Sequence, residues 1–270
     1  MKIKLKNNRN INVEIDGVGE KAIVFIHSFL WDTKMWNTQK EYFSSNYKCI
    51  RIDLWGHGES DYLGNEYKYS IESLSEDIIE VLNYLNIEKF IYVGLSVGGM
   101  IGTYLGINYS NRIEKLIIMD SFSGKEPLET KNLYFQMLDT IENLGYIPEP
   151  MTEIIAKMFF TPEEGEKKGQ LFIELKNNLL NIKKENIKTI VALGRGIFDR
   201  VDYLENMKII ENETYFIVGD KDIPRPVEES KIMCSLVKNS KLFIVEKAGH
   251  ISNIENSKDV NKYLELILND

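Results

Sequence analysis

A serine between two glycines stands in the segment Gly94-Leu95-Ser96-Val97-Gly98. An apolar run precedes this segment and a helical pattern follows it, so the serine is expected at a sharp turn from a strand into a helix. Such a turn exposes the serine hydroxyl, and glycines on either side avoid clashes that a β-carbon would create. We therefore predict that Ser96 is a nucleophile. Without its flanking elements, the same pentapeptide would indicate only a glycine-rich turn.

A serine nucleophile needs a general base, and the chain has three histidines: His27, His57 and His250. His250 follows Ala248-Gly249, just after the last apolar strand pattern. That position is at the carboxyl edge of a parallel sheet, the edge where Ser96 is also expected. We predict that His250 is the base, because a nucleophilic serine requires such a partner; the alternative is an ordinary loop histidine at the surface.

The base in turn needs a carboxylate that orients its ring. The segment Gly219-Asp220-Lys221-Asp222 follows a strand pattern that ends at Val218, and either aspartate is close enough in sequence to reach the sheet edge. We predict Asp222 for this role and keep Asp220 and Asp120, which ends an earlier strand, as alternatives.

Backbone N–H groups are expected to stabilise the oxyanion that forms when a serine attacks a carbonyl. One belongs to Val97, directly after the nucleophile. The second is expected from the loop that follows the strand at residues 22–26, with Phe29 as its donor. The side chains of Phe29 and Trp31 are also suited to core packing, which does not conflict with the backbone role.

The segment from Asp53 to Asp61 is rich in turn-forming residues and follows another strand pattern. A metal-binding or catalytic role for His57 would need a second histidine or a cysteine at ligand spacing, and the segment has none. We therefore interpret this segment as a structural loop.

Strand and helix patterns alternate along most of the chain, which is typical of a parallel sheet with helices on both faces. Strand patterns occur at residues 2–5, 11–15, 22–26, 49–54, 90–93, 116–119, 214–218 and 242–245, the first two as a hairpin. Helical patterns occur at 35–43, 71–85, 96–109, 227–236 and 260–268. The sequence thus predicts an α/β fold with a mostly parallel sheet of about eight strands.

Residues 122–206 interrupt this alternation with helical patterns alone, among them 133–144, 152–160 and 171–182. We expect a helical lid inserted between two parts of the core, residues 1–121 and 207–270. The lid is predicted to cover Ser96. Its candidates for lining an apolar pocket are Phe135, Met137, Met158, Phe159 and Phe160.

The formal net charge of −8 argues against binding to nucleic acid or to an anionic membrane. Cys49 and Cys234 give neither a metal spacing nor a disulfide framework. The first ten residues lack the apolar core of a signal peptide, and no apolar run is long enough to span a membrane. We expect a soluble cytoplasmic protein that acts on a small molecule, with a homodimer as an option.

Together these segments resemble the α/β-hydrolase superfamily. Residues 24–27 resemble its oxyanion strand and loop, residues 53–61 its D-x-x-G-x-G-x-S turn, and residues 94–99 its nucleophile elbow. Residues 219–222 are similar to its G-x-x-D acid segment, which favours Asp222 over Asp220. Residues 94–100 and 248–255 most resemble 3-oxoadipate enol-lactonases and related ester hydrolases. The order Ser96, Asp222, His250 is the order of this superfamily.

Three features bear on the branch of the superfamily. Ser28 stands where the family usually has glycine beside the oxyanion donor, and the proline typical of the cofactor-free haloperoxidases is missing from the same loop. Ser96 also sets the chain apart from dehalogenases and epoxide hydrolases of this fold, which use aspartate at the elbow.

The resemblance implies a serine hydrolase that cleaves a carboxylic ester or lactone through an acyl-enzyme and needs no metal or organic cofactor. One alternative is a C–C bond hydrolase of the meta-cleavage type, which a lid arginine such as Arg195 or Arg200 would favour by binding a substrate carboxylate. The other is a catalytically silent ligand-binding protein on the same fold.

Overall fold

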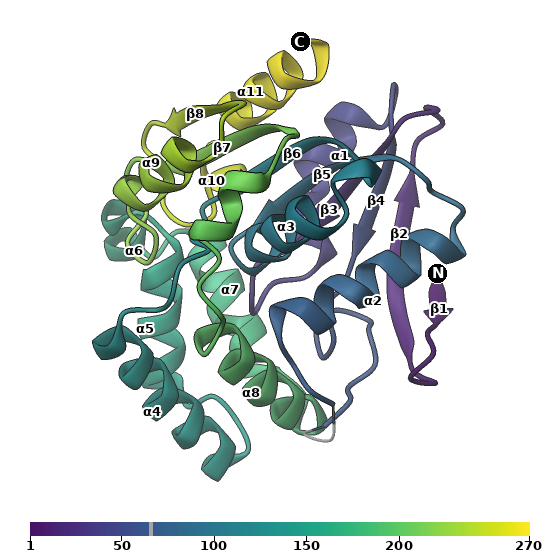
Figure 1. Ribbon diagram of the computed structural model, residues 1–270. Coiled ribbons are helices and arrows are strands. Elements are labelled where there is room, and N and C mark those ends of the chain that lie inside the picture. Colours follow the sequence, from purple (N-terminus) through teal and green to yellow (C-terminus); the bar gives the residue numbers. More distant parts are fainter. Residues whose placement is uncertain (65–66) are drawn as a thin grey trace.

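The computed structural model describes residues 1–64 and 67–270, and its centre is an eight-stranded sheet (Figure 1). The strands are β1 (Lys2–Lys4), β2 (Asn10–Asp16), β3 (Ala22–Ile26), β4 (Lys48–Ile52), β5 (Phe90–Leu95), β6 (Ile113–Met119), β7 (Glu213–Gly219) and β8 (Ser240–Val245). They lie in the order β1-β2-β4-β3-β5-β6-β7-β8. The pairs β1–β2 and β2–β4 are antiparallel, and all other neighbours are parallel.

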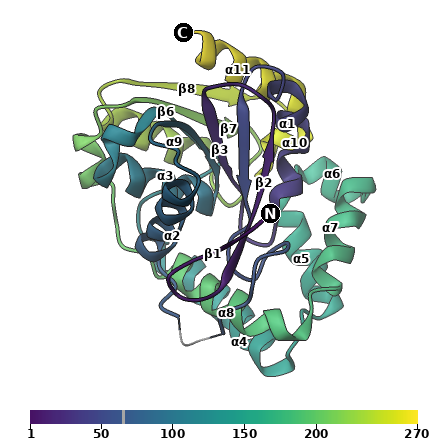
Figure 2. The same cartoon turned by 90° about the vertical axis from the view of Figure 1, so that its right-hand side faces the viewer.

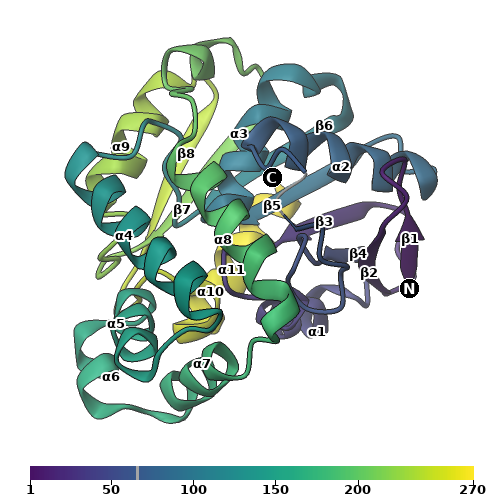
Figure 3. The same ribbon diagram turned by 90° about the horizontal axis from the view of Figure 1, so that it is seen from below.

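Helices cover both faces of this sheet (Figures 2 and 3). The helices are α1 (Asn37–Phe43), α2 (Ile71–Tyr84), α3 (Val97–Asn108), α4 (Leu128–Leu144), α5 (Glu149–Phe159), α6 (Pro162–Lys167), α7 (Gln170–Leu180), α8 (Lys184–Phe198), α9 (Val227–Leu236), α10 (Ser252–Glu255) and α11 (Ser257–Asn269). Short 3₁₀ helices span Thr33–Trp36, Ser110–Arg112 and Glu205–Ile209. Helices α2, α3 and α9 lie on one face, and α1 and α11 lie on the other.

Local sequence explains these elements. Every residue of β3 is buried, as expected for an apolar strand with a neighbour on each side and helices on both faces. Helix α2 begins at a capping box in which Ser70 and Ser73 satisfy each other's backbone N–H groups. Its buried residues, Leu74, Ile78 and Val81 among them, recur at helical spacing and face the sheet.

Five helices, α4 to α8, lie between β6 and β7 in the sequence, and this stretch contains no strand. They gather beyond the carboxyl ends of the parallel strands (Figure 1). Within this group, α4 packs on α8 and α5 packs on α7. The mostly parallel sheet with helices on both faces is the fold class predicted from the sequence. In the described ranges, no helix combines the length and the apolar character needed to cross a bilayer.

Candidate active site

Ser96 lies at the turn where β5 ends and α3 begins, at the carboxyl edge of the sheet. Its backbone angles, φ 57° and ψ −114°, lie in a region that residues other than glycine seldom occupy. The Ser96 N–H donates to the Met119 carbonyl on β6 (2.9 Å), and the Ser121 hydroxyl donates to the Ser96 carbonyl (2.7 Å). These two hydrogen bonds hold the sharp turn that the sequence predicted.

The glycines around Ser96 allow backbone segments to approach closely. A β-carbon at Gly94 would lie 2.2 Å from the Gly98 carbonyl oxygen, and one at Gly98 would lie 2.3 Å from the Ile26 carbonyl oxygen. The buried Tyr92 hydroxyl donates to the Gly98 carbonyl at 2.6 Å. The G-x-S-x-G pattern is therefore a packing requirement. A side chain at Gly98 would push the start of α3 away from β3, and one at Gly94 would push it away from β5.

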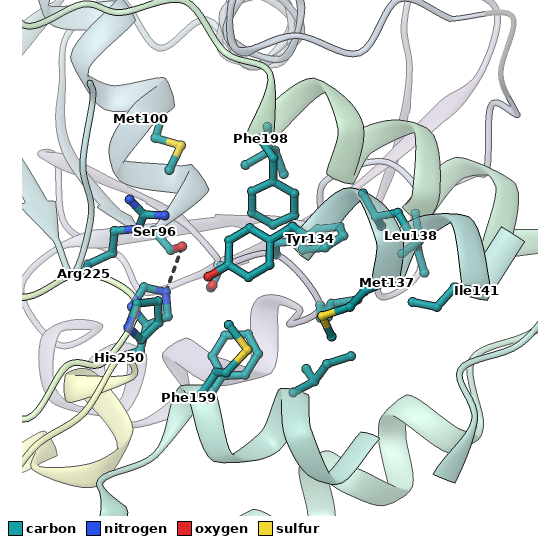
Figure 4. A pocket seen from close by; sticks show the side chains of 18 residues that line it. Ser96, Met100, Tyr134, Met137, Leu138, Ile141, Phe159, Phe198, Arg225 and His250 are labelled. Carbon is teal, nitrogen blue, oxygen red and sulfur yellow. Dashed lines mark hydrogen bonds between the residues drawn. The ribbon is translucent and has the colours of Figure 1, made fainter. Parts of the chain in front are cut away.

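The three residues that the sequence singled out for a triad lie together (Figure 4). The His250 Nε2 is 2.9 Å from the Ser96 Oγ, and its Nδ1 is 2.9 Å and 3.1 Å from the two carboxylate oxygens of Asp222. Because a carboxylate only accepts, these partners place the imidazole proton on Nδ1 and leave Nε2 to accept from the serine hydroxyl. The backbone N–H of Arg225 donates to Asp222 Oδ1 (2.9 Å), and this hydrogen bond fixes the orientation of the carboxylate.

The two alternative aspartates occupy different places. The Asp220 side chain is exposed and contacts the Ala248 N–H at 3.3 Å. Asp120 is fully buried; it accepts from the Gly219 N–H (2.8 Å) and from the Ser252 hydroxyl (2.6 Å). Burial, with Asp222 nearby, raises the pKa of Asp120 well above its ordinary value. Asp120 therefore ties the end of β7 to the segment after His250, and the carboxylate that hydrogen-bonds the histidine ring is that of Asp222.

The histidine loop is tied to the end of α5. The backbone N–H of His250 donates to the Phe159 carbonyl at 3.0 Å. The centroids of the Phe159 ring and the imidazole are 5.6 Å apart. The Glu255 carboxylate accepts from the N–H groups of Gly249 (2.6 Å) and Thr161 (3.0 Å). The position of the histidine therefore depends on the inserted helices as well as on the sheet.

Phe29 and Val97, the predicted oxyanion donors, come from two different segments at the carboxyl edge of the sheet. Val97 is the first residue of α3, and Phe29 lies just after β3, where its ring contacts the rings of His57 and Phe198. No acceptor among the described residues takes the backbone N–H of either residue. Both N–H groups are thus available to an external oxygen, as an oxyanion hole requires.

His57 and His27 hold the loop that carries Phe29. The Leu30 N–H donates to His57 Nε2 (3.0 Å), and the His57 Nδ1 donates to the Trp55 carbonyl (3.0 Å). His27 accepts from the Leu54 N–H at Nε2 (2.8 Å). Each ring must be neutral to accept at Nε2. Burial lowers the pKa of both histidines, that of His57 to about 3.

The segment from Asp53 to Asp61 has the structure of a tight loop. The buried Asp53 carboxylate accepts from the N–H groups of Thr33 (2.7 Å) and Glu59 (3.0 Å). Gly58 has a φ of +50°, and a β-carbon there would lie 2.1 Å from the Asp53 carboxylate. These contacts support the interpretation of this segment as a structural loop that positions its neighbours.

An apolar pocket opens beside Ser96, between the sheet edge and the inserted helices (Figure 4). Its cavity volume is about 100 Å³, several times the ~10–15 Å³ that one water requires. Helix α4 contributes Tyr134, Met137, Leu138 and Ile141, and α5 contributes Ile155, Met158 and Phe159. Helix α8 contributes Ile190, Ile197 and Phe198. The pocket is therefore suited to a small, mainly apolar group.

Three of the five lining candidates from the sequence lie at the pocket: Met137, Met158 and Phe159. The expectation for the other two was wrong. Phe135 points to the outer side of α4, where the Arg195 and Lys131 side chains lie over its ring. Phe160 is completely buried against Phe172, behind the pocket wall.

The two arginines considered for carboxylate binding are both engaged elsewhere. Arg195 pairs with Asp139 and Glu142 on the outside of the inserted helices, and the buried Arg200 pairs with Glu126. The pocket arginine is Arg225, which the sequence analysis did not single out. Both Glu126 oxygens lie 2.6 Å from its guanidinium, so Arg200 and Arg225 share one buried carboxylate.

Other pocket residues were also missed. Tyr134, Leu138 and Ile141 recur at helical spacing within the predicted helix 133–144, and this pattern would have identified them as one face. Pro224 and Arg225 come shortly after Asp222 in the sequence, so their proximity to that residue was the available signal.

Comparison with known proteins identifies the family. Residues 21–257 match the family described as alpha/beta hydrolase fold. The chain belongs to the α/β hydrolase fold family. This hydrolase is 25% identical to a 3-oxoadipate enol-lactonase of Acinetobacter baylyi over 92% of its own length and 88% of that protein. The resemblance to enol-lactonases inferred from the motifs is thereby confirmed.

Solved structures show the same fold. A thermophilic esterase from Thermogutta terrifontis superimposes on the hydrolase with a TM-score of 0.89 at 22% identity, covering 100% of this chain and 97% of that one. A meta-cleavage product hydrolase from Pseudomonas fluorescens gives a TM-score of 0.84 at 21% identity, with the same coverage of both chains.

The close approach of α3 to β3 predicts the effect of a methyl group at Gly98. We expect Gly98→Ala to lower the free energy of unfolding by about 1–3 kcal/mol, because the methyl group would overlap the Ile26 carbonyl. In Gly165→Ala, a matched change on α6, the nearest atom is 3.5 Å away, so no loss is expected. Urea unfolding of both variants checks this, and equal stabilities would show that the elbow tolerates a side chain.

The neutral, buried His57 predicts a dependence of stability on pH. The unfolded histidine binds a proton below its ordinary pKa of 6.5, whereas the folded one does so only near pH 3. The contribution of His57 to stability is therefore complete above pH 6.5 and is lost as the pH falls toward 3, at up to about 1.4 kcal/mol per pH unit.

His57→Gln should accordingly flatten the fall in stability between pH 7 and pH 5, although His27 keeps part of the slope. Urea unfolding of both proteins at half-unit pH steps measures the difference. Parallel curves of stability against pH for the variant and the unmodified protein would contradict the conclusion that folding keeps His57 uncharged.

Proposed function

We propose that this hydrolase cleaves a carboxylic ester or lactone of a small molecule through an acyl-enzyme on Ser96. The observation that carries the proposal is the continuous chain of hydrogen bonds from Asp222 through His250 to Ser96, which ends at the wall of an apolar pocket. Such a chain makes a serine hydroxyl nucleophilic, because its proton has an acceptor already in place.

In the first half of the proposed reaction, Ser96 Oγ attacks the substrate carbonyl carbon while His250 Nε2 takes its proton. The negative charge that develops on the carbonyl oxygen is stabilised by the N–H groups of Val97 and Phe29. His250 then gives its proton to the leaving oxygen as the C–O bond breaks. Asp222 holds the ring tautomer and stabilises the imidazolium.

In the second half, a water molecule gives a proton to His250 and attacks the acyl carbon. The bond to Ser96 Oγ breaks, Ser96 regains its proton, and the acid leaves. Apart from this water, the proposed steps use groups of Ser96, His250, Asp222, Val97 and Phe29. We further propose that α4 to α8 act as a lid that excludes bulk water from the acyl-enzyme.

The similarity to an esterase and an enol-lactonase supports ester or lactone cleavage as the reaction class. Cleavage of a C–C bond in a vinylogous diketone ranks second, because Arg195 pairs with Asp139 and Glu142 outside the pocket, and Arg200 and Arg225 both already pair with Glu126. We also propose that the intact triad makes turnover, rather than silent ligand binding, the function of the pocket.

Hydrolysis of a panel of aryl esters from acetate to octanoate tests this function. We expect activity to peak at a short acyl chain because the pocket is small, with a burst of released phenol that reports the acyl-enzyme. Ser96→Ala should lower kcat by roughly 10⁴-fold or more.

Ser75→Ala is the control, since Ser75 is a buried serine whose hydroxyl bonds only to the Ile71 carbonyl within α2. It should retain activity. Turnover that survives Ser96→Ala would rule out this nucleophile, and turnover of a vinylogous diketone without ester turnover would favour the C–C hydrolase.

A further inference from the structure

A second and larger cavity adjoins the apolar pocket. This cleft lies between core segments 30–38 and 56–59 and the inserted helix α7, and its volume is about 610 Å³, against about 100 Å³ for the pocket beside Ser96. Charged and amide side chains, such as those of Glu174 and Asn178, line much of it. Within residues 1–64 and 67–270, Leu30 and Ile190 alone line both cavities. These two residues therefore form the wall between an apolar pocket and a polar cleft.

Leu30 holds its place in this wall at a conformational cost. It is the third residue of a turn that the Trp31 N–H closes by donating to the Ser28 carbonyl (3.1 Å), and its φ is +68°. A positive φ at this position of a turn favours glycine, because a β-carbon crowds the backbone there. The hydrogen bond from the Leu30 N–H to His57 Nε2 (3.0 Å) holds the strained residue. Since glycine would adopt the same turn without strain, the leucine side chain itself must have a use that offsets the cost.

Ile190 contributes the other part of the wall from helix α8, where it is buried. The neighbouring Thr189 hydroxyl oxygen accepts from the N–H groups of Leu63 and Gly64 (both 2.9 Å), so this part of α8 is tied to the core. Leu30 is half-buried and packs against the apolar cluster that includes the inserted helices. Both wall residues are thus held in place, and an apolar chain that extends from Ser96 in this direction meets a closed apolar surface.

We propose that Leu30 and Ile190 set the upper limit on the length of the acyl chain, because they close the pocket against the cleft. A methylene group too many for a closed apolar pocket lowers kcat/KM by roughly 10-fold to 200-fold. Removal of either side chain joins the pocket to the cleft, so that a longer chain can extend beyond the wall. The native substrates therefore carry a short acyl group. This inference rests on the proposed ester-hydrolase function.

The ratio of kcat/KM for 4-nitrophenyl octanoate to kcat/KM for 4-nitrophenyl butanoate tests the wall. In the unmodified protein this ratio should be well below one. Leu30→Gly and Ile190→Ala should each raise it roughly tenfold or more. Glycine fits the turn at residue 30 without strain, and the second variant changes a different element, so each result stands without the other. Because the ratio compares two esters in the same variant, a general loss of activity cancels.

Ile155→Ala is the matched control, because Ile155 is a buried isoleucine that lines the pocket from α5, away from the wall. It enlarges the pocket by the same substitution as Ile190→Ala but leaves the wall closed, so it should raise the ratio far less. A folded wall variant with an unchanged ratio would overturn the inference, as would an equal rise in Ile155→Ala. Either result leaves the esterase proposal intact. A protein that hydrolyses neither ester would overturn both.

Discussion

The first turn of α3 packs directly on the end of β3, with the backbone at Gly98 against the Ile26 carbonyl and no side chain between them. This approach places the two loops that flank Ser96 side by side. One carries Val97 at the start of a helix, and the other carries Phe29 just beyond a strand. The strained angles of Ser96 persist because hydrogen bonds to Met119 and Ser121 oppose relaxation. The rest of the site is arranged around a turn that the sheet does not allow to relax.

Much of the remaining order comes from buried polar groups outside the set Ser96, Asp222 and His250. His57 and His27 each accept a backbone N–H and must stay uncharged to do so. Asp120 connects the acid loop to the residues after His250. These contacts are costly to break in an apolar environment, since each would leave an unpaired buried group. Loops at the edge of the sheet thereby gain a rigidity that is normally found within strands and helices, and a catalytic arrangement requires it.

The sequence predicted those parts of the molecule that depend on local patterns. Continuous apolar runs identified the buried strands, and the motifs identified Ser96, Asp222 and His250, which the structure brings together. The pocket lining was predicted less well because it depends on rotation about a helix axis. Phe135 and Tyr134 are adjacent, yet about 100° of rotation separates them, so one lies outside and the other faces the serine. The contact of His57 with Leu30 was also beyond a local pattern, because it joins two loops that only the folded sheet brings close.

The hydrogen bond from the His250 N–H to the Phe159 carbonyl joins the histidine loop to the inserted helices. Glu255 strengthens this junction by binding both Gly249 and Thr161. Swinging α5 outward would break these bonds and remove the Phe159 ring from the imidazole. The position of His250 is thus coupled to the position of α5, since the same hydrogen bonds fix both. A separation of α4 or α8 from the sheet would leave these bonds between α5 and the histidine loop in place.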